Sequence, residues 1–486
     1  MKTKIYNVVL ITIMAFLCGC DESFLEKYPT TSIAAGTFWT SESDVKMGLT
    51  GCYSKLKGDY LTWTRGTLDA AVDNGYSKGY YNANYILQTG TLDPDNCSIQ
   101  NSLYSAAYAG ISACNVFLMN FSKAALPVSA ANVYEAEAKF LRAFYYFELV
   151  QRWGGVVIYR EVPSNIDDLK IAKSTEEEVY NFIKEDLDFA VNNLPDVAYS
   201  SGHAVKASAL ALQARIALFR SKWDEVISSA NAIISSGKYS LATDLRSCFI
   251  HQEGQLTCPE ILFSIKYLST SDGRQLETDY GSEVCFFRES GLVPTKDLID
   301  DYEAGDLRLK KWYFNSPDMI TFTREDGYEY AGCETMYTNY GLIKFAAIWD
   351  DQLYQSAMRS IITGHDFVLF RLSEIYLMYA EAMVEKGGGT TTDSNALKYA
   401  NGIRARANVT ALTSLSRDNI RKERRREMAF EGLRYFDVQR WRIGSTLTGK
   451  VIFGSNKIVW NDKFYQWPFS RSEMDINTKL VQNEDY

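Results

Sequence analysis

The sequence has few histidines and prolines, and its basic side chains are outnumbered by acidic ones. Its 3 histidines, His203, His251 and His365, lie far apart and show no HExxH motif, so they give no basis for a metal hydrolase or a catalytic triad. Lysine and arginine total 51 against 60 aspartates and glutamates, a formal net charge of -9. A charge of this sign argues against nucleic acid or an anionic membrane surface as a partner.

The cysteines form no zinc-binding or disulfide-rich pattern. Those after Cys20 are scattered and include no CxxC pair. Cys248 and Cys258 could pair across a loop, but the sequence alone leaves their redox state open. Asp93 and Asp95 begin like a calcium-binding loop, yet the glycine and the terminal glutamate of such a loop are missing. We therefore expect no metal site and no cofactor.

Neighbouring acidic residues do not indicate a glycosidase. Such an enzyme needs two carboxyl groups about 5–9.5 Å apart in a cleft. The acidic runs here, Glu176–Glu178, Asp300–Asp301 and Asp350–Asp351, are more simply explained as solvated helix starts or turns. We expect that the protein is not an enzyme.

The N-terminus indicates a bacterial lipoprotein signal. Two lysines precede an apolar run, Val8–Leu17, that is too short to span a bilayer as a helix. Small residues then lead to Cys20, which is the pattern of a lipobox. We expect a signal peptide over 1–19, lipidation of Cys20, and a tether over 20–40, so that only the lipid anchor contacts the membrane. A plain secretory signal with a chance cysteine is the alternative.

Periodicity and capping signals predict a mainly helical single domain over 41–486. The small residues of Ala204–Ser236 suit antiparallel helices in contact, as in helical-hairpin repeats. Two long irregular ranges, 61–101 and 239–361, interrupt the helices, and their aromatic and polar composition is typical of functional loops. The last segment, Tyr465–Tyr486, is expected to be extended. The expected helices are Ser41–Lys57, Leu103–Phe121, Val133–Trp153, Thr175–Leu194, Ala204–Arg220, Trp223–Ser236, Phe367–Glu385 and Asp393–Ala407.

The densest cluster of charged and aromatic residues is Arg421–Trp441, RKERRREMAFEGLRYFDVQRW. It contains no proline and is predicted to be one helix of about five to six turns. Its glutamates lie within a turn of its arginines, which favours a partly buried ion-pair network over a nucleic-acid patch. Its apolar second half indicates burial, and Gly432 suggests the close approach of another element. We interpret this stretch as scaffold.

Several segments together resemble the SusD/RagB family of outer-membrane nutrient-binding lipoproteins. The segments are CDESFLEKYP after the lipobox, AEAKFLRAFYYFELVQRWGGV, AVKASALALQARIALF, FRLSEIYLMYAEA, RRREMAFEGLRYFDVQRW and PFSRSEMDINTKLVQN. They occur in the family's order, and the resemblance covers nearly everything from Cys20 onward. Tyr159–Arg160 stands where the family commonly has a proline, a departure within a loop.

The resemblance implies an α-helical fold with tetratricopeptide-like hairpins. It also implies a lipid-anchored lid on a SusC-like TonB-dependent outer-membrane transporter, to which the lid delivers captured glycans without catalysis. The implied location is the outer membrane, facing the cell exterior. The acidic pair Asp21–Glu22 after the lipidated cysteine points to the same location.

The resemblance places the ligand-binding groups in the two irregular ranges. Sugar binding needs flat apolar faces for the C–H groups of the rings, plus amide, carboxylate or guanidinium groups for the hydroxyls. For any single aromatic residue, packing within its own loop is the alternative. The candidates are Trp63, Asp73, Asn74, Tyr76, Tyr80 and Tyr81 in the first range, and Phe287, Arg288, Tyr337 and Tyr340 in the second.

Two other functions fit the same sequence. The scaffold could bind a non-glycan nutrient such as a peptide or a glycopeptide, or its helical hairpins could form an adaptor that binds only protein. Binding of a polysaccharide without release of product would separate the glycan hypothesis from both.

Overall fold

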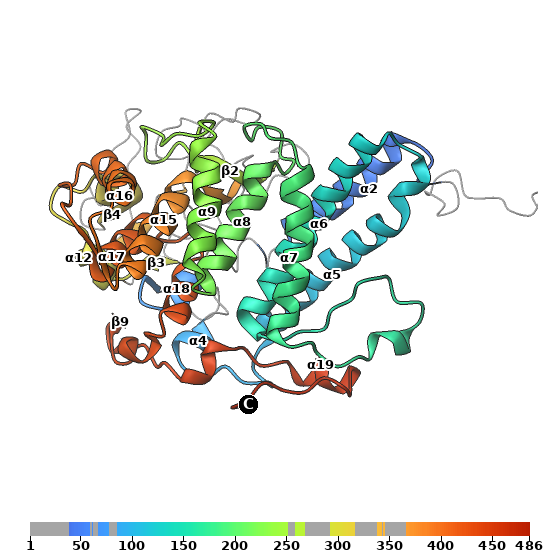
Figure 1. Ribbon diagram of the computed structural model, residues 1–486. Helices are drawn as coiled ribbons and strands as arrows, with labels where there is room; N and C mark the ends of the chain where they lie inside the picture. The colour runs from blue at the N-terminus through green and yellow to red at the C-terminus, as the bar shows by residue number, and fades with distance from the viewer. Residues whose placement is uncertain are drawn as a thin grey trace, which may run out of the picture.

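The computed structural model describes residues 38–58, 61, 67–76, 85–250, 258–267, 292–315, 338–342, 344–345 and 366–486. Helices account for most of these residues (Figure 1), and the strands among them form two-stranded antiparallel sheets. The mainly helical fold predicted from the sequence is confirmed.

The first half of the chain consists of helices that pack on one another in chain order (Figure 1). α5 packs on α2 and α6, α6 on α7, α7 on α8, and α8 on α9. This arrangement is consistent with the predicted helical hairpins. Each helix matches a predicted one, with the largest differences at the starts of α5 and α6. The bounds are α2 (Glu42–Ser54), α5 (Ser98–Asn120), α6 (Val128–Trp153), α7 (Glu176–Asn193), α8 (Lys206–Phe219) and α9 (Trp223–Ser235).

Local chemistry explains where these helices begin and how closely they pack. The Thr175 hydroxyl accepts a hydrogen bond from the N–H of Glu178, whose carboxylate accepts one from the N–H of Thr175, so the two residues cap α7. In α8, small apolar residues are buried on all sides because α7 and α9 pack against it. At Gly110 in α5, an added Cβ would lie 2.4 Å from the Tyr145 ring, so glycine permits the close approach of α6.

Among the described residues, one helix is long and apolar enough to cross a membrane by length and composition. It is Ser98–Ala124, which includes α5, and 44% of its most apolar window is buried inside the protein. Because α5 lies against both α2 and α6, we interpret it as a core helix.

The second half begins with two paired strands and continues as helices. β2 (Ile261–Ile265) runs antiparallel to β6 (Phe367–Arg371). The predicted helix Phe367–Glu385 is therefore wrong in its first five residues, which form β6, because a strand far away in the sequence supplies their partner. The helices α15 (Leu372–Lys386), α16 (Ser394–Arg406), α17 (Arg417–Glu427) and α18 (Arg434–Arg440) follow.

The predicted single helix over Arg421–Trp441 is also wrong, because α17 and α18 are separate helices joined by a turn. In this turn φ is +64° at Phe430 and +71° at Gly432, values that glycine adopts freely and phenylalanine rarely. The turn directs the N–H groups of both residues at the carboxylate of Asp69, at 2.9 and 3.2 Å. The predicted close approach of another element at Gly432 is thus confirmed. The approaching group is the carboxylate of Asp69, which accepts hydrogen bonds from the N–H groups of Phe430 and Gly432 in place of backbone carbonyls of a helix.

Short elements complete the described chain, including parts of both irregular ranges. α19 interrupts the C-terminal segment predicted to be extended, because the Ser470 hydroxyl accepts from the N–H of Glu473 and caps the first turn. The short elements are η2 (Lys55–Lys57), η3 (Thr67–Ala71), β1 (Gly75–Tyr76), α4 (Tyr85–Gln88), η4 (Phe121–Ala124), η5 (Ile166–Leu169), β3 (Val293–Pro294), α12 (Lys296–Asp301), α13 (Leu307–Trp312), β4 (Tyr313–Asn315), β5 (Tyr340–Leu342), β7 (Thr390–Thr391), β8 (Leu415–Ser416), η9 (Gly444–Leu447), β9 (Val451–Phe453), β10 (Asn456–Lys457), η10 (Asp462–Tyr465) and α19 (Arg471–Ile476).

Candidate functional site

The first irregular range contains a buried segment, 67–76, that is held against the turn between α17 and α18. Every residue of this segment is buried. Asp69 accepts hydrogen bonds from the N–H groups of Phe430 and Gly432, and from the side-chain amide of Asn74 at 2.7 Å. Burial raises the pKa of Asp69 to about 6, although these three donors favour its charged form. The segment is thereby fixed on the α17–α18 turn.

Asp73 ties the same segment to three cations. Its carboxylate makes two hydrogen bonds of 2.9 Å to Arg434, and Arg425 and Lys450 lie 3.3 and 3.2 Å away. Burial opposes the charge of Asp73, but the three cations outweigh it and hold its pKa well below the ordinary value. The neighbouring Asn74 accepts from Arg425 at 2.8 Å. The polar groups of both candidate ligand residues are thus directed at protein partners.

The two irregular ranges are joined to each other by β1 and β3. Tyr76 of β1 pairs with Val293 of β3 in antiparallel register. Next to this pair, the Thr295 hydroxyl donates to the backbone oxygen of Asp73 at 2.7 Å. The described part of the first range therefore shares a hydrogen-bonded edge with the described part of the second.

Two buried cations anchor the second range to α17 and to the turn that follows it. Arg308 of α13 is fully buried and pairs with Glu423 at 2.7 Å and with Glu427 at 3.0 Å. Lys344 donates to Glu431 at 2.6 Å. Burial lowers the pKa of Lys344 to about 8, while the charge of Glu431 opposes that shift. Charges at this depth are tolerated because each has an opposite charge beside it.

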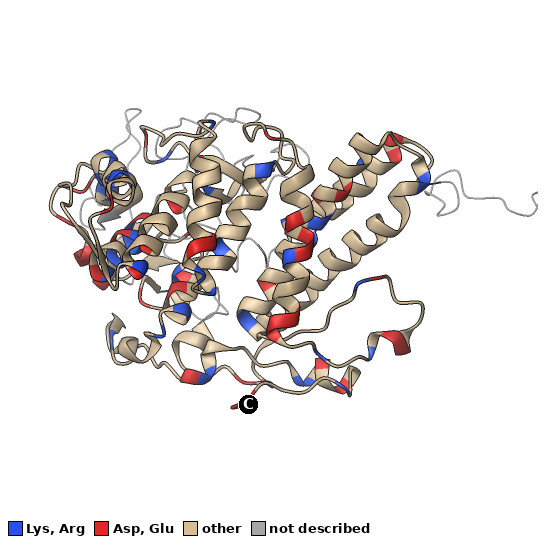
Figure 2. Ribbon diagram, in the orientation of Figure 1, with Lys and Arg blue, Asp and Glu red and all other residues tan. Residues whose placement is uncertain are grey.

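Glu427 is the centre of this charge network. It pairs with Arg371 at 2.8 Å, with Arg308 at 3.0 Å and also with Arg406. Burial opposes its ionisation, but the three arginines hold its pKa well below the ordinary value. Figure 2 shows acidic and basic residues close together along the ribbon of α12 and α17. The buried ion-pair network that the sequence predicts for α17 is confirmed.

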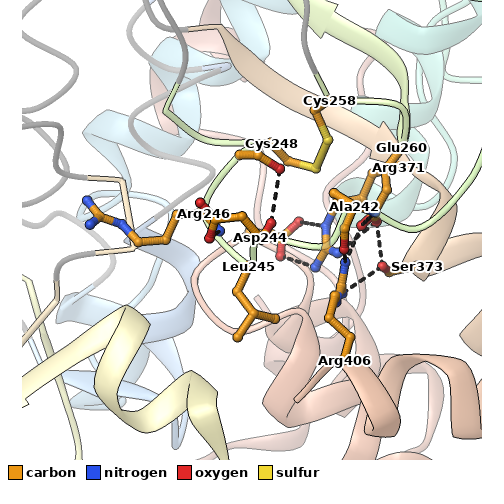
Figure 3. Close-up of a disulfide and its surroundings, with 12 residues drawn as sticks. Ala242, Asp244, Leu245, Arg246, Cys248, Cys258, Glu260, Arg371, Ser373 and Arg406 are labelled. Carbon is orange, nitrogen blue, oxygen red and sulfur yellow. Dashed lines mark hydrogen bonds and ion pairs between the residues drawn. A yellow bond between two sulfur atoms is a disulfide. The ribbon is translucent and has the colours of Figure 1, made fainter. Parts of the chain in front are cut away.

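A disulfide joins Cys248 to Cys258 beside this network (Figure 3). Two residues after Cys258, the carboxylate of Glu260 accepts from the Ser373 hydroxyl at 2.6 Å and pairs with Arg406. Arg406 in turn pairs with Glu427. The disulfide therefore closes a loop of the second irregular range next to the arginines and glutamates that support the site.

The candidate ligand residues fall into two groups. Asp73, Asn74 and Tyr76 lie in the buried segment, where Tyr76 is 6% exposed and its ring lies 5.5 Å from that of Phe453. Tyr340 is half-buried at the start of β5. The structure thus places three of these side chains in the scaffold and leaves Tyr340 partly open to solvent. Trp63, Tyr80, Tyr81, Phe287, Arg288 and Tyr337 lie outside the described residues, as does Cys20.

The acidic runs considered for catalysis have structural partners where they are described. Asp300 pairs with Lys296 at 2.5 Å and Asp301 with Arg426 at 3.2 Å. Glu178 belongs to the cap of α7. Within the described ranges, no group of three histidine, cysteine or acidic side chains is placed to hold a metal ion.

Sequence reasoning missed the residues that position the site. Asp69 and Lys450 were not recognised as anchors, and neither was the pairing of Asp73 with Arg434. The sequence does contain one signal. The arginines of Arg421–Arg426 need more acidic partners than their own helix supplies, so other segments must provide some of these partners. No local pattern identifies which distant residues provide those partners.

Family models, curated relatives and solved structures all show similarity to one family over most of the chain. Residues 23–218 match the family model described as "Starch-binding associating with outer membrane", and residues 310–486 match "SusD family". SusD-like protein P2 of Formosa agariphila is 26% identical over 99% of each chain. Starch-binding protein SusD of Bacteroides thetaiotaomicron is 25% identical over 72% of each chain. The crystal structure of a SusD-like protein from Bacteroides fragilis superimposes with a TM-score of 0.80 at 25% identity, covering 95% of this chain and 100% of the other.

Proposed function

The chain belongs to the SusD/RagB family, and on that premise we propose that it captures glycans at the cell surface and passes them to a SusC-like TonB-dependent transporter. Members of this family are binding proteins, and this chain is a binding protein rather than an enzyme. Capture uses aromatic faces and polar side chains of the two irregular ranges.

The observation that carries the proposal is the joining of the two irregular ranges. β1 and β3 hold them edge to edge, and Asp73 fixes this junction to α17 and α18 through Arg425 and Arg434. A ligand surface composed of two ranges far apart in sequence requires such a rigid base, because loosely held loops lose binding free energy when they become ordered. The candidates Tyr80, Tyr81, Phe287 and Arg288 follow or precede this base in the sequence.

The chemistry of the candidates sets the expected affinity. Covering roughly 100 Å² of apolar area on one ring contributes about 2.5 kcal/mol before ordering costs. Two or three rings then give a dissociation constant in the range of about micromolar to millimolar. Weak and reversible binding suits a protein that must release its ligand to a transporter.

The location in this proposal follows from the N-terminus. A signal peptide over 1–19 is removed, Cys20 carries the lipids, and residues 20–40 tether the domain to the outer membrane with the domain facing the cell exterior. Several acyl chains on one cysteine give a lasting anchor, whereas one chain binds only marginally. Residues 1–37 lie outside the described part, which begins at residue 38.

The test is polysaccharide binding by the chain from Asp21 to Tyr486. Affinity electrophoresis through a panel of polysaccharides should show retardation by at least one of them, and reducing ends should not accumulate. The triple variant Trp63→Ala, Tyr80→Ala and Tyr81→Ala should abolish retardation. Tyr76 is left intact because its ring packs on Phe453, so its removal would disturb the fold.

A matched pair of single variants controls for general effects. Tyr340→Ala should weaken retardation, whereas Tyr134→Ala should not, since Tyr134 is a half-buried tyrosine on α6 whose hydroxyl donates to Glu42. Binding of peptides or glycopeptides without any polysaccharide would favour another nutrient. Wild-type and triple-variant proteins that both fail to bind any nutrient, yet both bind the transporter, would favour a protein-only adaptor.

A further inference from the structure

A polar pocket of about 530 Å³ lies in the helical part of the chain, on elements other than those that join the two irregular ranges. It is lined by the ends of α6, α7 and α8 and by α18, which can be located in Figure 1, and by Tyr465–Gln466. Its volume is that of a site for a small ligand. The side chains that matter for its chemistry are those of Gln439, Tyr180, Arg220, Lys222, Arg442 and Glu176.

Two buried polar atoms in the wall of this pocket have no hydrogen-bond partner among the described residues. Gln439 uses its amide N–H groups for the backbone oxygens of Gln151 and Tyr465, and its Oε1 atom remains without a donor. The Tyr180 hydroxyl is likewise without a partner. The two residues are only 6% and 3% exposed. Buried polar groups are nearly always satisfied, so these two atoms can each still form a hydrogen bond with a molecule that enters the pocket.

The charged side chains of the pocket leave a surplus of cations. Arg220 pairs with Glu177 and lies 4.4 Å from the centre of the Tyr180 ring. Arg442 lies 4.4 Å from the centre of the Tyr465 ring, and neither it nor Lys222 forms an ion pair in the described part of the chain. The one remaining carboxylate of the lining is Glu176. Arg442 and Lys222 together outnumber this one carboxylate, so the balance of charge here favours an anion.

We propose that this pocket is a second ligand site, which binds an acidic sugar unit: a hydroxylated ring that bears a carboxylate. Arg442 and Lys222 receive the carboxylate, while Gln439 Oε1 and the Tyr180 hydroxyl receive ring hydroxyls. The choice of a sugar among hydroxylated carboxylates rests on the proposed function. The site itself is independent of the two irregular ranges, because neither its lining nor its hydrogen bonds involve them.

Calorimetric titration of the chain from Asp21 to Tyr486 tests this site with sodium glucuronate, glucose and sodium acetate. Glucuronate should bind at least about tenfold more tightly than either of the others, because only it offers both the charge and the hydroxyls. Arg442→Gln should remove the preference for glucuronate over glucose. Tyr180→Phe should weaken glucuronate binding about threefold or more without lowering the melting temperature, since its hydroxyl has no partner among the described residues.

Arg160→Gln is the matched control for Arg442→Gln. Arg160 is also an exposed arginine over an aromatic ring, 4.6 Å from the centre of Phe182, but it lies outside this pocket. Equal affinities for glucuronate and glucose, or equal effects of the two arginine variants, would overturn the second site. If the same preparation is still retarded by a polysaccharide in affinity electrophoresis, the proposed function stands without the second site. If Tyr340→Ala weakens polysaccharide retardation and leaves glucuronate binding unchanged, the two sites are separate.

Discussion

The carboxylate of Asp73 and the guanidinium of Arg434 form a two-point ion pair, with both N–O distances at 2.9 Å, across 361 residues of sequence. Both side chains are buried. This pair fixes the buried segment 67–76 of the first irregular range to α18. The strand pairing of Tyr76 with Val293 then attaches the second range to the same segment. The scaffold is therefore joined directly to the described parts of both irregular ranges.

Removal of the charge on Asp73 should destabilise the whole domain. Asp73→Asn keeps the size of the side chain but removes the carboxylate that pairs with the buried Arg434, and it leaves Arg425 with Asp297. Loss of one partner from a buried pair costs about 3–5 kcal/mol, so the free energy of unfolding in urea should fall by that amount. Asp300→Asn is the control, because its pair with Lys296 lies at the surface, and it should leave the stability unchanged. Similar stabilities of the two variants would contradict a central role for Asp73.

Gly432→Ala should destabilise the turn between α17 and α18. Gly432 has φ +71°, a region that costs about 1–2 kcal/mol for a residue with a Cβ. Gly51→Ala in α2 should instead stabilise the protein. An added Cβ there meets nothing within 4 Å, and alanine is the better helix former by up to about 1 kcal/mol. Thermal unfolding of the two variants should move in opposite directions. A shift of the same sign in both would show that the turn is not constrained as described.

The Cys248–Cys258 disulfide should stabilise the fold. It closes a loop with a sequence separation of 10, for which loop-closure entropy predicts about 2–3 kcal/mol. The variant Cys248→Ser with Cys258→Ser should therefore unfold at a lower urea concentration. Peptide mass spectrometry after alkylation of the unreduced, unfolded chain should find both cysteines unmodified. Alkylation of either one without reduction would rule out the bond.

Raising the pH should weaken the contact between His203 and Glu137. A hydrogen bond of 2.7 Å to this buried carboxylate raises the pKa of His203 above 6.5, against the effect of its partial burial. A raised folded-state pKa contributes stability that is fully present below 6.5 and lost as the pH rises through the raised value. The melting temperature of the wild type minus that of His203→Gln should therefore decrease from pH 5 to pH 8.5. A difference that is constant or grows with pH would contradict this sign.

Local signals were sufficient to predict the long helices of the first half of the chain, α2 and α5 to α9. Thr175 with Glu178 marks the start of α7, and Pro195 follows its end, so both ends are encoded nearby. The alanine-rich run of α8 likewise predicts a helix that packs on both sides. These elements depend on neighbours within a few residues, which a single sequence displays.

The parts that failed depend on distant partners. Phe430 adopts a positive φ because its N–H meets Asp69, and Phe367–Arg371 is a strand because β2 lies beside it. The pairing of Asp73 with Arg434 could not be predicted either, since nothing near Asp73 in the sequence reveals this partner. The Tyr180 hydroxyl shows the same limit, because only a three-dimensional arrangement shows that no described residue forms a hydrogen bond with it.

The central claim is that the two irregular ranges form one ligand surface. Hydrogen–deuterium exchange of the chain from Asp21 to Tyr486, with and without an oligosaccharide prepared from the retarding polysaccharide, tests it most directly. We predict slower exchange on binding in peptides from both 61–101 and 239–361, at the same ligand concentration. Protection in one range alone, or in neither, would contradict the account.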